Sequence, residues 1–175
     1  MNLKHDQPYF YGRRTFSRIL TLQYLYKLDI IPGFNNTEIT MGDASSILNQ
    51  IQIDGFSDSI SNYEIEDIQY ANELLNGVNN QKNTIDSIIE TFATSFPLKD
   101  LPIIDKNILR ISIYEIKYVS LKFEIALNEA IEIAKIFGSE KSSSFINGVL
   151  DSFIQKKYKN KEINEFGRQI ERYCY

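Results

Sequence analysis

Three arginines near the start of the chain are the residues whose type and spacing most directly indicate chemistry. Arg13 and Arg14 open a helical stretch, and Arg18 follows Arg14 by four positions. Residues four apart share a helix face, so we expect Arg14 and Arg18 to present their guanidinium groups side by side. Guanidinium groups pair with phosphate oxygens and stack on bases. The pattern predicts contact with single-stranded RNA or DNA, and a solvated basic face is the alternative that the residue types leave open.

Two further observations favour the nucleic-acid interpretation. Arginine at a helix start opposes the helix macrodipole, which favours acids there, so a purely structural design would place Asp or Glu at these positions. Aromatic rings also lie nearby in the sequence, at Tyr9, Phe10, Tyr11 and Phe16. Stacking of a base on such a ring contributes about 1–3 kcal/mol. Three arginines are a modest basic footprint, so we expect weak binding or help from a partner.

The charge is unevenly distributed along the 175 residues, although the net charge is only −4. Residues 1–28 hold five bases and one acid, residues 29–81 hold nine acids and no base, and residues 82–175 hold fourteen bases and thirteen acids. Local charge decides what approaches a surface, so this distribution predicts a basic helix start followed by an acidic, solvated loop at about residues 30–62. No EF-hand spacing occurs in the acidic stretch.

The residue types exclude most catalytic and metal-binding arrangements. The chain has one histidine, His5, and one cysteine, Cys174, so neither an internal disulfide nor a Cys or His metal cluster can form. Glu129 and Glu132 have the spacing of an ordinary surface pair, with no histidine to complete a site. Glycine-rich phosphate loops are absent from the sequence. We therefore expect no catalytic residue, no metal and no cofactor.

The hydropathy pattern predicts a soluble, cytoplasmic protein. No segment reaches the roughly 20 apolar residues of a membrane span, and the first residues lack the apolar core of a secretory signal. The periodicity of apolar residues is helical throughout and shows no strand alternation, so the expected class is all-α. About seven helices are expected. Six helical patterns lie near residues 13–29, 63–78, 83–95, 103–120, 126–137 and 144–156, and two further stretches, near 44–51 and 161–172, are candidates for a short and a more polar helix.

Several positions within these helices carry their own predictions. The helix at 103–120 is apolar around most of its circumference and is expected at the centre of the fold, with Arg110, Tyr114 and Lys117 as its polar strip. Gly138 is placed to end the preceding helix, and Ser142–Ser144 offer oxygens for the next helix start. Gly148 inside that helix predicts close approach of a neighbouring helix.

Four segments together resemble one known family. RRTFSRILTLQYLY (13–26), YANELLNGV (70–78), ILRISIYEI (108–116) and ALNEAIEIAKIFGSEKSSSFINGVLD (126–151) occur in the order found in the NusB family of transcription antitermination proteins. The resemblance implies a compact, non-enzymatic helical bundle of two packed subdomains. It also implies binding to the boxA element of nascent ribosomal RNA, together with NusE, a ribosomal small-subunit protein, so that RNA polymerase reads through terminators. No DNA or membrane partner is implied.

The resemblance also assigns residues and boundaries. It implies a leader at 1–12, a NusB-like domain at 13–155 that contains the acidic loop, and a C-terminal extension at 156–175 without a counterpart. Thr15 and Phe16 interrupt the arginine cluster, which is denser in the family. The residues implied at the RNA surface are Arg13, Arg14, Arg18, Gln23, Tyr26, Phe137 and Phe145, and those implied at the partner surface are Asp105, Lys141 and Phe145.

Two alternative functions follow from the same sequence. The interrupted arginine cluster is compatible with a helical protein-interaction module that has little RNA affinity of its own. NusB-like domains also precede the catalytic domain of some RNA cytosine methyltransferases, but the sequence contains no α/β cofactor-binding segment, so this alternative is disfavoured.

Overall fold

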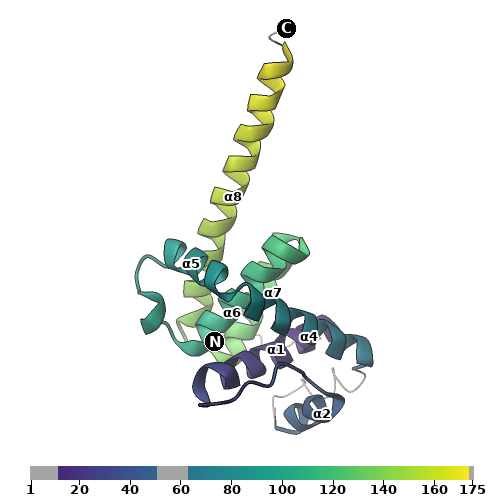
Figure 1. The fold of residues 1–175 in the computed structure, drawn as a ribbon. Coiled ribbons are helices and arrows are strands. Elements are labelled where there is room, and N and C mark those ends of the chain that lie inside the picture. The colour runs from purple at the N-terminus through teal and green to yellow at the C-terminus, as the bar shows by residue number, and fades with distance from the viewer. Residues whose placement is uncertain (1–11, 51–62, 174–175) are drawn as a thin grey trace, which may run out of the picture. The chain divides into compact units, whose positions relative to one another are not determined.

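The computed structural model describes residues 12–50 and 63–173, and the side chains of residues 12–47 and 63–157. Every regular element in these residues is helical, which confirms the prediction of an all-α fold. The chain forms two compact units that meet in sequence between Asn80 and Gln81 (Figure 1). The first contains α1 (Arg13–Ile30), α2 (Met41–Gln50) and α4 (Ile65–Asn80). The second contains α5 (Lys82–Phe92), η1 (Leu98–Asp100), α6 (Ile103–Tyr114), η2 (Glu115–Val119), α7 (Phe123–Phe137) and α8 (Ser142–Tyr173).

Helices α1 and α4 pack along each other in the first unit through small hydroxyl residues (Figure 1). The Oγ of Ser17 donates to the carbonyl oxygen of Asp67 at 2.8 Å. One turn later, the Oγ1 of Thr21 lies 3.1 Å from the carbonyl oxygen of Ala71. Both hydroxyls are buried, and they also lie within hydrogen-bond distance of carbonyls of their own helix. Side chains this short allow the two backbones to approach closely while their polar atoms stay satisfied.

Helix α2 starts on a reciprocal cap between Thr40 and Asp43. The backbone N–H and the hydroxyl of Thr40 both donate to Oδ2 of Asp43, at 2.9 and 2.6 Å. The N–H of Asp43 donates back to Oγ1 of Thr40 at 3.2 Å. This is a capping box, in which two backbone donors at the helix start are satisfied at once. The helix therefore begins at Met41, three residues before the predicted start at Ala44.

Asn72 fastens the segment between α1 and α2 to α4. Its Oδ1 accepts from the N–H of Ile39 at 2.7 Å, and its Nδ2 donates to the carbonyl of Ile39 at 2.9 Å. One side chain thus pairs both backbone groups of a residue 33 positions earlier. Ile39 is consequently buried although it lies outside any helix.

Helix α6 is the centre of the second unit, because α5, α7 and α8 all pack against it. The prediction that Arg110 belongs to an exposed polar strip on this helix is wrong. Arg110 is buried, and its Nε and Nη2 donate to the two carboxylate oxygens of Asp86 on α5 at 2.7 and 2.8 Å. Its Nη1 donates to Oδ1 of Asn107 at 2.8 Å. Because the guanidinium is paired on both sides, its burial is tolerated.

The predicted helix at 103–120 changes its winding near its end. The α-helical part stops at Tyr114, and residues Glu115–Val119 form the π-helix η2. Ser120 then adopts a left-handed conformation with φ 59°. The N–H groups of Ser120 and Leu121 both donate to the carbonyl of Glu115. This double acceptance closes the helix where its wider turn leaves carbonyls unpaired.

Helix α8 is continuous from Ser142 to Tyr173, so the predicted break between residues 156 and 161 is wrong (Figure 1). The sequence from Val149 to Phe166 contains neither glycine nor proline, and nothing in it ends a helix. The close approach predicted at Gly148 is also not observed, because no heavy atom of another described element lies within 4 Å of a Cβ built there.

Gly138 forms the C-cap of α7 as predicted, but for a steric reason. Its φ of −90° is open to any residue. A Cβ at this position would lie 2.5 Å from Cβ of Ser142 and 2.7 Å from the carbonyl oxygen of Ala134. Ser142 Oγ accepts from the N–H of Ser139 at 2.8 Å, so the serine stabilises the loop before α8 rather than a donor inside the helix. None of the helices in the described residues has the length and hydropathy that a membrane crossing requires.

Candidate RNA and partner surfaces

Arg13 ties the start of α1 to the start of α4. Its Nε donates to Oδ2 of Asp67 at 2.8 Å, and its Nη2 donates to Oε2 of Glu64 at 3.1 Å. The hydrogen bond to Asp67 is the main reason why the pKa of Arg13 is raised. The same Oδ2 accepts from the N–H of Glu64 at 2.8 Å, so Asp67 also caps α4. Glu66 lies 4.0 Å from Nη2 as well, so three acids accompany the guanidinium of Arg13 at this surface.

The side chain of Arg14 is exposed at the surface and stacks on an aromatic ring. Its Cζ lies 4.0 Å from the centroid of the Tyr70 ring on α4. This cation–π contact holds the planar group in one orientation. A fixed guanidinium beside a ring matches both parts of a nucleotide, since it binds phosphate and can stack with a base.

Arg18 is buried, with 4% of its surface exposed. The prediction that Arg14 and Arg18 present guanidinium groups side by side at the surface is therefore wrong. Arg18 lies between Phe16 and Leu20, within a run of α1 in which every residue from Thr15 to Leu22 is buried. The role of Arg18 in RNA binding stays a prediction, and in this structure its side chain belongs to the interior.

Gln23 and Tyr26 are half-buried on α1. Gln23 follows Arg14 by nine positions, about two and a half helical turns, so the two side chains leave opposite sides of the helix. The implied RNA-binding residues of the first unit thus do not form one face of α1. Arg14 with Tyr70 is the arrangement in this unit that carries an exposed cation and a ring together.

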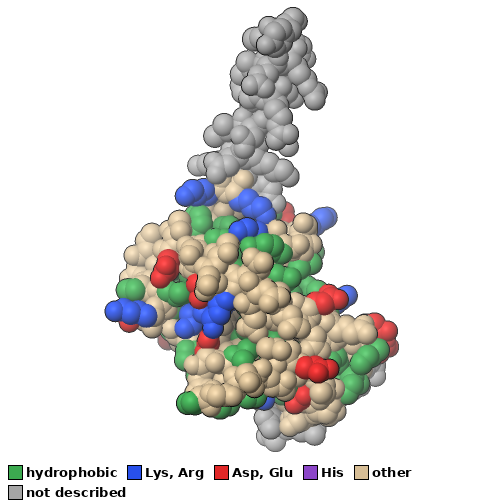
Figure 2. Space-filling model, in the orientation of Figure 1, with side chains coloured by type: hydrophobic (Ala, Val, Ile, Leu, Met, Phe, Trp, Pro, Cys, Tyr) green, Lys and Arg blue, Asp and Glu red, His purple; other side chains and the backbone are tan. Residues whose placement is uncertain are grey.

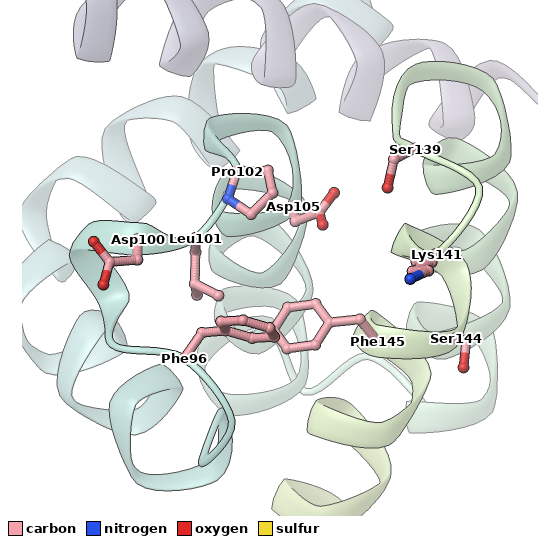
Figure 3. A pocket seen from close by; sticks show the side chains of 9 residues that line it. All are labelled: Phe96, Asp100, Leu101, Pro102, Asp105, Ser139, Lys141, Ser144 and Phe145. Atoms are coloured by element: carbon pink, nitrogen blue, oxygen red, sulfur yellow. The ribbon is translucent and has the colours of Figure 1, made fainter.

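The second unit contains a pocket with a volume of about 480 Å³ (Figure 3). It joins the α5–α6 connection, the start of α6, and the α7–α8 loop with the start of α8. Asp105, Lys141 and Phe145, the three residues implied at the partner surface, all line it. The remaining lining residues are Phe96, Asp100, Leu101, Pro102, Ser139 and Ser144.

Asp105 gives the pocket its polar character. Only 4% of the residue is exposed, and within the described part of the chain its Oδ1 has no hydrogen-bond partner. Burial raises the pKa of this carboxyl, and a hydrogen bond from Ser142 partly offsets that effect. A buried acceptor without a donor is costly, so a ligand that donates to Oδ1 would recover this free energy.

Two phenylalanines form the apolar wall. The rings of Phe96 and Phe145 meet edge to face, with centroids 6.4 Å apart, below the Asp105 carboxyl in Figure 3. Phe96 is 55% exposed, which is unusual for so large an apolar side chain. Phe96 and Ser139 were not among the predicted site residues. The sequence offers one signal for Phe96, its position directly before the turn that begins at Pro97.

Lys141 and Phe137, which the resemblance also implies, differ in their exposure. Lys141 is exposed beside the pocket, and Phe137 is half-buried at the end of α7 outside the lining residues. No group of acidic, histidine or cysteine side chains among the described residues is arranged to hold a metal ion. The pocket thus combines a carboxyl group that accepts hydrogen bonds with the aromatic rings of its wall. This combination suits a cationic side chain with an aliphatic stem.

Comparison with known proteins identifies the family of the chain. The family model described as the NusB family matches residues 15–155. The transcription antitermination protein NusB of Bdellovibrio bacteriovorus is 35% identical over 140 residues, which are 79% of this chain and 92% of that protein. The NusB of Thermodesulfovibrio yellowstonii is 33% identical over 147 residues, 83% of this chain and 93% of that protein.

Solved structures show the same fold. A T. maritima NusB structure superposes with a TM-score of 0.63 at 25% identity, covering 81% of this chain and 90% of that one. A structure described as antitermination factors NusB and NusE in complex with dsRNA gives a TM-score of 0.61 at 21% identity, covering 82% and 97%. Because the family model spans most of the sequence and the relatives align over nearly their whole length, the chain belongs to the NusB family.

Proposed function

We propose that this protein is a transcription antitermination factor. It binds boxA-type RNA of nascent ribosomal RNA transcripts together with a NusE-type ribosomal protein, so that RNA polymerase reads through terminators. The curated relatives carry the name of this activity. The protein acts by binding, without a catalytic step or a cofactor, within the cytoplasmic elongation complex.

The observation that carries RNA binding is the Arg14–Tyr70 stack. Arg14 is exposed, whereas Arg13 is paired with Asp67 and Arg18 is buried. A guanidinium in water gains little from a loose phosphate contact, because ordering a long side chain costs entropy. The ring of Tyr70 reduces that cost by holding the group in advance.

Asp105 supports the proposed binding of a NusE-type protein. A NusE-type protein that places a lysine or arginine in the pocket would donate to the buried Oδ1 and pack its stem on Phe96 and Phe145. Lys141 at the rim sets a positive charge beside that acid, so the complementary partner surface is expected to carry an acid opposite it.

RNA binding is tested by fluorescence anisotropy on a single-stranded boxA-type RNA, with a duplex of the same sequence as a second probe. We expect Arg14→Ala to weaken single-strand binding about tenfold, the effect of one charge-assisted hydrogen bond. The slope of log affinity against log salt should fall by about 0.7. Arg14→Lys keeps the charge and loses the planar stack, so an intermediate affinity is expected.

Lys135→Ala is the matched control, since it removes one positive charge that already faces Glu132 at 2.6 Å. It should leave the affinity for RNA unchanged. Equal binding by the wild-type protein and Arg14→Ala would show that Arg14 does not contact the RNA.

Partner binding is tested with Asp105→Asn and Asp100→Asn, two substitutions of the same chemistry in one pocket. Asp105 is buried, whereas Asp100 is exposed and points away from Phe145 in Figure 3. We expect Asp105→Asn to weaken binding of the NusE-type protein by tenfold or more, because a desolvated charge pair is lost. Asp100→Asn should change the affinity less than threefold, and a larger loss than for Asp105→Asn would refute this use of the pocket.

A second candidate function is a protein-interaction module with little RNA affinity of its own. The pairing of Arg13 and the burial of Arg18 favour it, because Arg13 is already engaged by acids and Arg18 lies in the interior. Isothermal titration separates the two candidates. Binding of the NusE-type protein without any gain in RNA affinity by the complex would support the second.

A further inference from the structure

A pair of tyrosines at the π-helix of the second unit forms an aromatic surface that the proposed function does not use. The rings of Tyr114 and Tyr118 are stacked, with centroids 5.4 Å apart and planes inclined by 27°. Tyr118 is 39% exposed. Its hydroxyl donates to Oε1 of Gln81 at 3.0 Å, which fixes the ring from its far end. We name Tyr114, Lys117, Tyr118 and Lys122 the Tyr118 surface.

The backbone under this surface is held in place from two directions. The carbonyl of Ile116, inside the π-helix, accepts from Nζ of Lys157 on α8 at 2.9 Å. The left-handed Ser120 turns the chain so that Leu121 donates back to Glu115. A π-helical turn is an uncommon winding and often marks a functional position. A platform fixed in this way loses little conformational entropy when a ligand stacks on it.

One lysine contacts the tyrosine pair, and a second follows a few residues later in the chain. Nζ of Lys117 lies 5.1 Å from the centroid of the Tyr118 ring, and Lys122 caps the start of α7 after the Ser120 turn. Both are exposed, as is Lys156 on α8. Figure 2 shows blue side chains just below the grey atoms where α8 leaves the described side chains. Of the two nearby acids in the chain, Glu115 is buried and Glu124 is exposed on the first turn of α7.

We propose that the Tyr118 surface is a second contact for single-stranded RNA, in addition to the Arg14–Tyr70 contact. A base extends the stacked tyrosine pair, and Lys117 and Lys122 contact the phosphates on either side of it. This inference rests on the proposed function, because it assumes that RNA is a ligand of the chain. The face of an aromatic ring is electronegative and repels carboxylates, so the stacked rings favour a nucleic acid over an acidic peptide.

The contact predicts a dependence on RNA length. One RNA contains the boxA-type element alone, and a second extends it by about 20 unstructured nucleotides at each end, more than a single stacking site occupies. The wild-type protein should bind the extended RNA more tightly. Tyr118→Ala should reduce that gain by at least about fivefold, the lower end of the stacking energy of one base.

The salt dependence of RNA binding distinguishes the contribution of the lysines from that of the Tyr118 ring. Lys117→Ala with Lys122→Ala should lower the salt slope for the extended RNA by about 1.4, two single-strand phosphate contacts, and leave the slope for the short RNA unchanged. Tyr118→Phe keeps the ring and loses the bond to Gln81, so most of the affinity should remain. Circular dichroism and chemical denaturation verify that each variant is folded.

Photocrosslinking locates the contact directly. Extended RNA that carries 5-iodouridine should crosslink to the peptide containing Tyr118, and the crosslink should disappear in Tyr118→Ala. The inference is overturned if the extended RNA gains no affinity, if the Tyr118 and lysine variants bind it like the wild-type protein, or if an acidic peptide and not RNA binds there. Failure of the proposed function looks different, since Arg14→Ala would then leave the short RNA unaffected as well.

Discussion

The Nε of Arg13 lies 2.8 Å from Oδ2 of Asp67, and this contact joins the first turn of α1 to the first turn of α4. An arginine at a helix start is unfavourable against the macrodipole of its own helix. Here the acids at the start of the neighbouring helix compensate it, with Glu64 at 3.1 Å and Glu66 at 4.0 Å. A residue type that the sequence associates with RNA thus has a structural role in this unit.

Removing Asp67 should destabilise the first unit. Asp67→Ala deletes the cap hydrogen bond to the N–H of Glu64, which alone costs about 1–2 kcal/mol of unfolding free energy. Urea denaturation followed by circular dichroism measures the effect. Glu66→Ala is the control, because its exposed carboxylate lies 4.0 Å from Arg13, and it should change stability by less than about 0.5 kcal/mol.

The pair formed by the buried Arg110 and the half-buried Asp86 should be intolerant of losing one member. Asp86→Ala leaves the guanidinium buried without its carboxylate, which costs about 3–5 kcal/mol. Glu132→Ala breaks an ion pair whose lysine is half exposed, and a loss of less than about 1 kcal/mol is expected. Equal losses in the two variants, measured by guanidinium chloride denaturation, would contradict the importance of burial.

The same substitution at two glycines should act in opposite directions. Gly138→Ala forces a Cβ to within 2.7 Å of the Ala134 carbonyl, and such overpacking costs about 1–3 kcal/mol. Gly148→Ala places a methyl group in open space on an exposed helical position, which should stabilise the protein by about 0.5–1 kcal/mol. Thermal denaturation of the two variants gives the sign, and a destabilised Gly148→Ala would show that this position is crowded.

Asp105 should make stability depend on pH. Burial raises the pKa of its carboxyl above the value in the unfolded chain. The folded state therefore holds this proton more tightly, and the resulting stability is present at acid pH and lost as pH rises through the folded pKa. Asp105→Asn removes this loss, so the variant should be more stable than the wild-type protein at pH 7, with a difference that shrinks toward pH 3.

The affinity for the partner should depend on pH in the opposite direction to stability, again through Asp105. A cationic partner group pairs with the ionised carboxyl, so the affinity of the NusE-type protein should fall as pH is lowered through the pKa of Asp105. Isothermal titration at several pH values measures this change. The variant Asp105→Asn should bind weakly with no such pH dependence, and identical profiles for both proteins would exclude Asp105 as the titrating group.

The helices follow from the sequence because apolar periodicity is a local property. The predicted first helix at 13–29 is observed as Arg13–Ile30, and the start of α6 at Ile103 is as predicted. Charged residues in the interior do not follow from periodicity. Arg18 and Arg110 have the residue type of a surface, and only the acid or helix packed against each explains its burial, as Asp86 does for Arg110.

The pocket could be predicted only in part, for the same reason. Asp105, Lys141 and Phe145 were implied by the resemblance, and the structure brings them together. Phe96 and Ser139 lie in connections whose direction depends on tertiary packing, so no pattern in the sequence places them beside Asp105. The π-helix is missed because it continues α6 directly, with no glycine or proline in the sequence to mark the change of winding.

Asn72 and Tyr63 give the first unit two separate side-chain fastenings around α2. Asn72 fastens Ile39 before α2, and the hydroxyl of Tyr63 lies 2.7 Å from Oγ of Ser45 while its ring packs on Phe16. These two contacts fasten α2 and the segment before it to the rest of the unit by single side chains. The N–H of Ile39 is therefore a built-in reporter, because its hydrogen exchange measures how often the segment before α2 leaves Asn72 on α4.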